Sequence, residues 1–151
     1  MRLREASPQD ASDLAELIRR TGAELGWTLS AELESDLQRQ LSALAALPAD
    51  HRAWVIEVGG QVVAFALAHL QPYLIAPRPE LFVGELFVHP DHRGAGLGSA
   101  LLAQAEAFAA EAGCGRISLL NHRERASYTR GFYAEQGYRE RETMANFVKV
   151  L

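Results

Sequence analysis

Hydrophobic residues recur along the chain with two different periods, and each period predicts a type of element. Apolar side chains three and four residues apart, flanked by polar ones, are typical of helices with one buried face. Runs of β-branched and aromatic residues are typical of strands. The expected helices span residues 7–22, 30–48, 96–112 and 127–136, and the expected strands span residues 2–6, 54–58, 61–70, 81–88 and 116–120, with one or two closing strands in 138–151.

Glycines and prolines divide these elements. Gly59-Gly60 separates two strands by two residues, which predicts a tight antiparallel hairpin, and the prolines of residues 71–80 predict a loop. The helix at 96–112 joins two strands and therefore predicts a parallel crossover pair. The sequence thus predicts an α/β fold with a mixed, mostly antiparallel sheet of six to seven strands. Strands four and five form its parallel pair, and about four helices flank it.

Composition limits the classes of protein. The 151 residues are 48% apolar and 23% charged, which suits one globular domain over residues 1–151. A net charge of −4 gives no basic field for nucleic acid, and no apolar run reaches membrane-spanning length. Cys114 is the only cysteine and forms no internal disulfide, so the cytoplasm is the expected compartment.

A glycine-rich segment between the strand at 81–88 and the following helix predicts an anion site. Gly94, Gly96 and Gly98 leave the backbone amides uncovered at the positive end of the helix dipole, and Arg93 adds a cation. A plain strand-to-helix turn is the alternative. A dinucleotide fingerprint is disfavoured because Ser99 occupies its last glycine position, and the lysine of a nucleoside-triphosphate loop is missing.

The segment Arg93-Gly94-Ala95-Gly96-Leu97-Gly98 resembles the pyrophosphate-binding signature of the GNAT superfamily of N-acetyltransferases. Asn121, Phe132-Tyr133 and Gly137-Tyr138 resemble a later block of that family. The resemblance implies a GNAT-like fold in which strands four and five splay apart to admit acetyl-CoA. It also implies cofactor contacts from the residues Leu86, Phe87, Val88, Arg93, Gly94, Ala95, Gly96, Leu97, Gly98, Ser99 and Asn121.

Two side chains are the candidates for proton transfer. By resemblance, Tyr133 is the general acid that protonates the coenzyme A thiolate; Tyr128 is the reserve candidate, and a core aromatic is the other interpretation of Tyr133. An alkyl amine with a pKa near ~10.4 is mostly protonated at pH 7, so attack on a thioester needs a base. Glu85 matches an acidic position common in the family and is the candidate base. A charged residue on a solvated strand edge is its alternative interpretation.

The resemblance implies direct transfer of an acetyl group from acetyl-CoA to a primary amine of a small molecule, peptide or protein. An inactive acyl-CoA-binding sensor or structural module is the alternative. No metal is expected, because His89 and His92 lack further ligands nearby in the sequence. The acceptor pocket is expected between the first two helices and residues 72–79, with Trp27 and Tyr73 as wall residues, and a homodimer is allowed.

Overall fold

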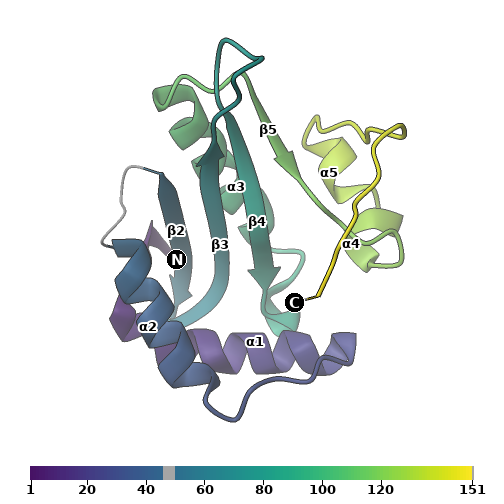
Figure 1. Cartoon of the computed structure of the whole chain (residues 1–151). Helices are drawn as coiled ribbons and strands as arrows, with labels where there is room; N and C mark the ends of the chain where they lie inside the picture. The colour runs from purple at the N-terminus through teal and green to yellow at the C-terminus, as the bar shows by residue number, and fades with distance from the viewer. Residues whose placement is uncertain (46–49, 151) are drawn as a thin grey trace. The chain divides into compact units, whose positions relative to one another are not determined.

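The computed structural model describes residues 1–45 and 50–150, and the chain divides into two compact units, Met1–Leu120 and Asn121–Leu151 (Figure 1). The strands of the first unit are β1 (Arg2–Glu5), β2 (His51–Val58), β3 (Gln61–Gln71), β4 (Glu80–Val88) and β5 (Arg116–Leu119). Its helices are α1 (Ala11–Leu25), α2 (Leu33–Ala45) and α3 (Leu97–Glu111), with short 3-10 turns at Pro8–Asp10 and Pro90–His92. The second unit contains α4 (Ala126–Thr129) and α5 (Phe132–Glu135).

The five strands form one mixed sheet in the order β1-β2-β3-β4-β5. The pairs from β1 to β4 are antiparallel and the β4–β5 pair is parallel, which confirms the predicted fold class and the crossover through α3. The expected count of six to seven strands is wrong for the described residues, because 138–150 form no strand. Phe147, Val148 and Val150 have high strand propensity but are more than three-quarters exposed, and propensity alone does not form a strand without a paired neighbour.

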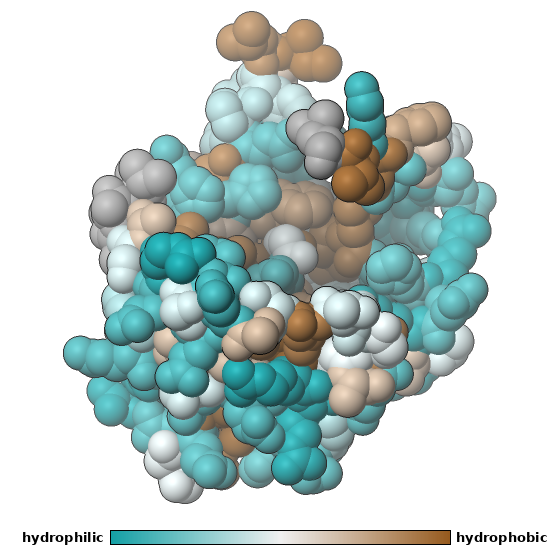
Figure 2. Space-filling view, turned by 60° about the horizontal axis from the view of Figure 1, so that its bottom comes forward, coloured by the Kyte–Doolittle hydropathy of each residue, from teal (hydrophilic) through white to brown (hydrophobic). Residues whose placement is uncertain are grey.

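Helices cover both faces of this sheet (Figure 1). One apolar cluster joins α3 to one face, and a second joins α1 and α2 to the other face. Val55 and Ile56 show the division, because these consecutive and fully buried residues belong to different clusters, as strand alternation requires. The outward faces of α1 and α2 carry exposed charged side chains such as Arg20 and Arg39. Figure 2 shows a largely hydrophilic surface with several apolar groups among the polar ones. No helix in the described part of the chain is both long and apolar enough to cross a membrane.

Two glycines explain where the predicted helix limits differ from the structure. Gly22 does not end α1: it is buried, and an added Cβ would lie 3.1 Å from the Leu29 side chain, so it serves close packing. The helix continues to Leu25 and is capped by Gly26 in a left-handed conformation. The helix predicted over 127–136 is divided into α4 and α5 at Gly131, whose φ is +71°. The predicted stop of α2 at Pro48 lies outside the described residues.

A buried ion pair fixes the start of α1. The Arg4 guanidinium donates to both carboxylate oxygens of Asp10 at 2.7 and 2.8 Å, and the Ser7 N–H donates to Asp10 Oδ2 at 2.7 Å. Asp10 is only 6% exposed. The hydrogen bond from Arg4, assisted by Ser7, holds the pKa of Asp10 below its ordinary value.

Asp10→Asn is therefore expected to lower the free energy of unfolding by about 2 kcal/mol at pH 7. A lowered folded-state pKa means that the carboxylate stabilises the fold above its unfolded pKa of about 3.9, and that this contribution is lost as the pH falls through the folded-state pKa. Urea unfolding at pH 7 and pH 3 measures the effect. Glu16→Gln, which removes an exposed pair with Arg20, is the control and should change stability by less than about 0.5 kcal/mol. An Asp10→Asn variant as stable as the parent at pH 7 would contradict this role.

Candidate active site

A β-bulge in β4 determines which way Glu85 points. Leu67 pairs with Glu85 and Ala68 pairs with Val83, so Gly84 is the extra residue of β4. Without the bulge, Val83 and Glu85 would share a face of the sheet, since side chains alternate along a strand. Val83 instead lies in the core beneath α3, and Glu85 lines a pocket on the α1 and α2 side.

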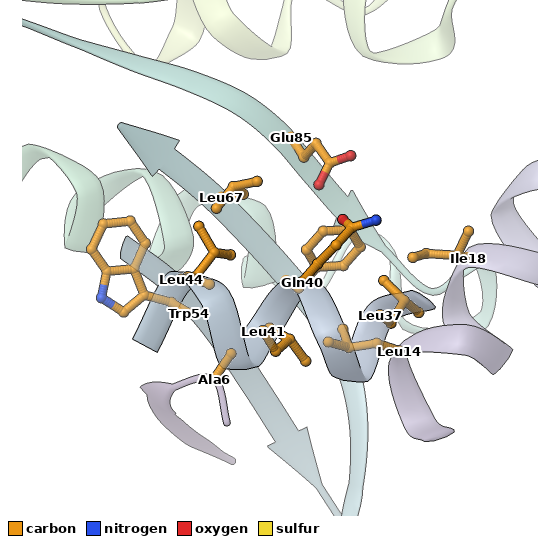
Figure 3. Close-up of a pocket in the computed structure, with 12 residues that line it drawn as sticks. Ala6, Leu14, Ile18, Leu37, Gln40, Leu41, Leu44, Trp54, Leu67 and Glu85 are labelled. Atoms are coloured by element: carbon orange, nitrogen blue, oxygen red, sulfur yellow. The ribbon is translucent and has the colours of Figure 1, made fainter. Parts of the chain in front are cut away.

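This pocket is mostly apolar. It lies between α1, α2 and the strands β2, β3 and β4, and it is partly open to solvent. Figure 3 shows the Glu85 carboxylate and the Gln40 amide at one side, with leucines from α2 and β3 around them. The lining residues are Ala6, Leu14, Ile18, Leu37, Gln40, Leu41, Leu44, Ala53, Trp54, Phe65, Leu67 and Glu85.

Apolar surroundings change the acidity of Glu85. Its side chain is reachable by water, yet it stands in a hollow with ten apolar lining residues, and desolvation raises the pKa of its carboxyl above the ordinary value. Within residues 1–45 and 50–150, no basic side chain forms an ion pair with it. A carboxylate with a raised pKa is a stronger base than an ordinary surface glutamate and is therefore better suited to accept a proton.

The end of β4 extends past its parallel neighbour. The register with β5 runs from the Glu80–Arg116 pair to the Val83–Leu119 pair and ends there. Leu86, Phe87 and Val88 continue beyond it and pair with β3 on their other edge. This arrangement agrees with the predicted divergence of strands four and five, and it leaves one edge of this segment without a neighbouring strand from β5.

The glycine loop follows directly from this strand end. Gly94 and Gly96 have φ angles of +79° and +77°, and a Cβ at either position would meet no atom within 4 Å, so the exposed Ala95 lies between two open glycines. Gly96 caps α3 without a side-chain hydrogen bond. The amides of the first helical turn, Leu97, Gly98 and Ser99, are therefore not covered by a capping side chain, as an anion site requires.

Arg93 holds this loop in place through its side chain. Its guanidinium donates to the Val88 carbonyl oxygen at 3.2 Å and pairs with the Glu24 carboxylate of α1 at 2.7 Å. The Arg93 guanidinium, which was expected to bind an anionic ligand, is therefore already paired with the Glu24 carboxylate. For binding a phosphate group, the uncovered backbone amides of the loop are therefore better placed than the Arg93 side chain.

The second unit places the two candidate tyrosines in different environments. Burial raises the pKa of the Tyr133 hydroxyl, and the nearby charges of Arg125 and Arg130 oppose that rise. The ring of Tyr133 contacts Phe132, with centroids 4.9 Å apart. The Tyr128 hydroxyl donates to Glu140 at 2.7 Å, and this hydrogen bond raises the pKa of Tyr128.

Other predicted site residues have local partners. The Asn121 amide donates to the Ser127 hydroxyl at 3.1 Å, so its side chain bridges to α4 within the second unit. His89 accepts a hydrogen bond from the Asp91 N–H at 3.2 Å, and no group of three metal-ligating side chains occurs in the described ranges. Burial raises the pKa of the Cys114 thiol, which disfavours a nucleophilic thiolate.

The expected wall residues lie elsewhere than the pocket lining. The Trp27 ring packs edge-on against Phe87 at 5.6 Å, and the Tyr73 ring lies under the Arg116 guanidinium at 5.5 Å. Helices α1 and α2 line this pocket, but no residue of the loop at 72–79 does. Gln40 of α2 and Leu67 of β3 also line the pocket and were not predicted as site residues. The leucine repeat of α2 indicates the helix face that includes Gln40's neighbours Leu37 and Leu44.

Comparisons with known proteins agree with this geometry. The model of the acetyltransferase (GNAT) family matches residues 15–138. A transcriptional regulator from Bacillus halodurans C-125 superposes with a TM-score of 0.83 at 21% identity, covering 99% of both chains. Glucosamine-6-phosphate N-acetyltransferase from Arabidopsis thaliana gives a TM-score of 0.80 at 17% identity, covering 98% of both chains. Ribosomal-protein-alanine N-acetyltransferase from Brucella melitensis biovar Abortus 2308 gives 0.76 at 21% identity, covering 99% of this chain and 100% of that one.

The sequence comparison with curated proteins gives no match. The family match covers more than half of the chain, and the solved structures share its fold. The chain therefore belongs to the GNAT acetyltransferase family.

Proposed function

We propose that this chain is an enzyme that transfers the acetyl group of acetyl-CoA directly to a primary amine of a small molecule, peptide or protein. The observation that carries this proposal is the position of Glu85. The Gly84 bulge turns its carboxylate into an apolar pocket, one residue before the strand segment that lacks a β5 partner. The family match runs through both compact units, and this supports one acyltransferase domain over residues 1–151.

The residues of the first unit fit acetyl-CoA by chemistry as well as by resemblance. The backbone of Leu86, Phe87 and Val88 would pair with the amides of the pantetheine arm, in place of a neighbouring strand. The open turn at residues 93–96 and the amides of Leu97, Gly98 and Ser99 would hold the pyrophosphate at the positive end of α3. Asn121 is proposed as a further cofactor contact, in competition with its bond to Ser127.

In the proposed reaction, Glu85 accepts a proton from the bound ammonium group, directly or through a water molecule. The neutral amine nitrogen then bonds to the thioester carbonyl carbon, and the carbon–sulfur bond breaks. Tyr133 donates its hydroxyl proton to the departing thiolate, and the second amine proton leaves with solvent. The raised pKa of the Tyr133 hydroxyl keeps this group protonated at neutral pH, as an acid requires.

An acyl-CoA-binding module without turnover is the second candidate. It would keep the glycine loop but have no need for a carboxylate with a raised pKa beside the strand edge. Thiol release from acetyl-CoA with a panel of primary amines, combined with calorimetry of acetyl-CoA binding, separates the two functions. Binding without thiol release for every amine would favour the module.

The glycine loop gives a direct test of cofactor binding. Gly96→Asp is expected to weaken acetyl-CoA binding at least tenfold by calorimetry, because a carboxylate would stand where the pyrophosphate is proposed to bind. Aspartate tolerates a left-handed φ better than most residues, so the fold should persist. Gly96→Asn, which lacks the charge, should weaken binding less.

Gly113→Asp is the matched control, because Gly113 follows the opposite end of α3 with a φ of +70° and similar open space. Its charge lies at the negative end of the helix dipole, so it should destabilise the fold at least as much as Gly96→Asp. Acetyl-CoA affinity should nevertheless remain unchanged in this control. Equal acetyl-CoA affinities in the two aspartate variants would contradict the proposal that the glycine loop binds the pyrophosphate.

A further inference from the structure

We infer that the acceptor is a primary amine with a compact apolar substituent, such as an alkylamine or arylalkylamine, and that its substituent binds among the leucines beside Glu85. This inference rests on the proposed acetyl transfer and specifies its acceptor class. It comes from the composition of the pocket, which lies entirely within the first unit.

The partly exposed apolar side chains of the pocket come from α1, α2 and β3. Leu37, Leu41 and Leu44 lie three and four residues apart on α2 and so share one face of this helix. Ile18 of α1 and Leu67 of β3 extend the same lining. Leu37, Leu44, Ile18 and Leu67 are only partly buried, so their apolar surface is available to a guest. Removing this surface from water is the driving force for an apolar substituent.

The polar part of the lining is small and selects for a cation. Of the twelve lining residues, Gln40 and Glu85 alone are polar, and none is lysine or arginine. An ammonium group beside Glu85 would form an ion pair with this carboxylate, which has no basic partner among the described residues. Figure 3 shows the Gln40 amide on the same side of the pocket as that carboxylate. Both polar groups would therefore contact the amine, and the leucines would contact its apolar substituent.

Polar amines fit this lining poorly. A polyhydroxylated amine would place several hydroxyl groups against leucine side chains, where each unpaired hydroxyl carries a desolvation cost. A phosphorylated amine would need a cation, and the lining holds none. Selection against such acceptors is expected to be strong, since unpaired polar groups discriminate more sharply than a missing methylene does.

A ladder of straight-chain amines tests this inference. With ethylamine, propylamine, butylamine, pentylamine and hexylamine, kcat/KM for acetyl transfer should rise about threefold for each methylene until the pocket is full. 2-Phenylethylamine should be a good acceptor. Ethanolamine and glucosamine should be poorer than butylamine by more than tenfold. Calorimetry of the same amines with the protein and coenzyme A should give the same order of affinity.

Substitutions in α2 test whether the dependence of kcat/KM on amine chain length arises in this pocket. Leu37→Gln keeps a good helix former but adds an amide to the apolar wall, so kcat/KM for hexylamine should fall about tenfold and that for ethylamine should change little. Gln38→Ala, at the exposed neighbouring position, is the control and should leave the ladder unchanged. If Leu37→Gln unfolds at a lower urea concentration, Leu37→Ala repeats the test with an apolar side chain of smaller volume.

The outcomes separate this inference from the proposed function. Turnover of glucosamine or ethanolamine at the rate of hexylamine would overturn the apolar acceptor and leave acetyl transfer intact. An affinity ladder in calorimetry without any thiol release would support the apolar amine site and contradict the transfer reaction. A flat affinity series, with or without turnover, would overturn the inference.

Discussion

Glu85→Gln is expected to lower kcat about 10²-fold at neutral pH while leaving acetyl-CoA affinity within a few fold of the parent. The substitution keeps the shape of the side chain but removes the group that accepts the amine proton. Activity should recover partly at high pH, because free amine becomes abundant without a base. Steady-state thiol release and calorimetry measure the two effects.

The pH profile identifies Glu85 more specifically than the rate alone. A base works in its deprotonated form, so activity should rise with pH through a pKa above the ordinary glutamate value of about 4.3. This ascending limb should be absent in Glu85→Gln. Glu16→Gln changes a carboxylate on the exposed side of α1 and should keep both the limb and the rate. A parent-like profile in Glu85→Gln would show that the proton leaves by another route.

The same pKa shift predicts an effect on stability with a definite sign. Because desolvation raises the folded-state pKa of Glu85, the ionised carboxylate destabilises the fold at neutral pH. Glu85→Gln should therefore be more resistant to urea than the parent at pH 7. The difference should disappear below the unfolded pKa of about 4.3, where Glu85 is protonated in both states. Lower activity with higher stability would distinguish a functional carboxylate from a structural one.

Tyr133→Phe is the second substitution with a large expected effect, about a 10²-fold loss of kcat. It removes only the hydroxyl that is proposed to protonate the coenzyme A thiolate, so acetyl-CoA affinity should stay within a few fold. The raised pKa of Tyr133 predicts that activity falls on the alkaline side only above the ordinary tyrosine value of about 10.

Tyr128→Phe is the matched control, since it removes a hydroxyl that donates to Glu140. This variant should keep the parent turnover and change stability little, because the hydrogen bond that it removes is exposed to solvent. The opposite pattern, with Tyr133→Phe active and Tyr128→Phe inactive, would assign the acid role to Tyr128. Full activity in both variants would show that neither tyrosine is the general acid and that solvent protonates the thiolate.

The crossover unit could be predicted from the sequence because local signals agree there. The apolar run of β4, the glycines at 94 and 96, and the helical period of α3 all require the same strand–loop–helix order. The glycine conformations confirm this agreement, since Gly94 and Gly96 both adopt left-handed φ angles.

The direction of Glu85 could not be predicted from alternation. Simple alternation places Val83, Glu85 and Phe87 on one face, whereas the bulge at Gly84 moves Val83 to the opposite face. A glycine inside a strand is a known signal for a bulge, but its register depends on pairing with β3. For the same reason, the residues of 138–150 could not be assigned from strand propensity, because pairing depends on a partner distant in the sequence.

The most direct test of acetyl transfer is mass spectrometry of a reaction containing the protein, acetyl-CoA and a mixture of apolar and polar primary amines. We expect an N-acetylated amine and free coenzyme A in equal amounts, no acetyl group on the protein, and a loss of both products in Glu85→Gln. Coenzyme A released without an acetylated amine, or tightly bound acetyl-CoA with no product from any amine, would contradict the proposed function.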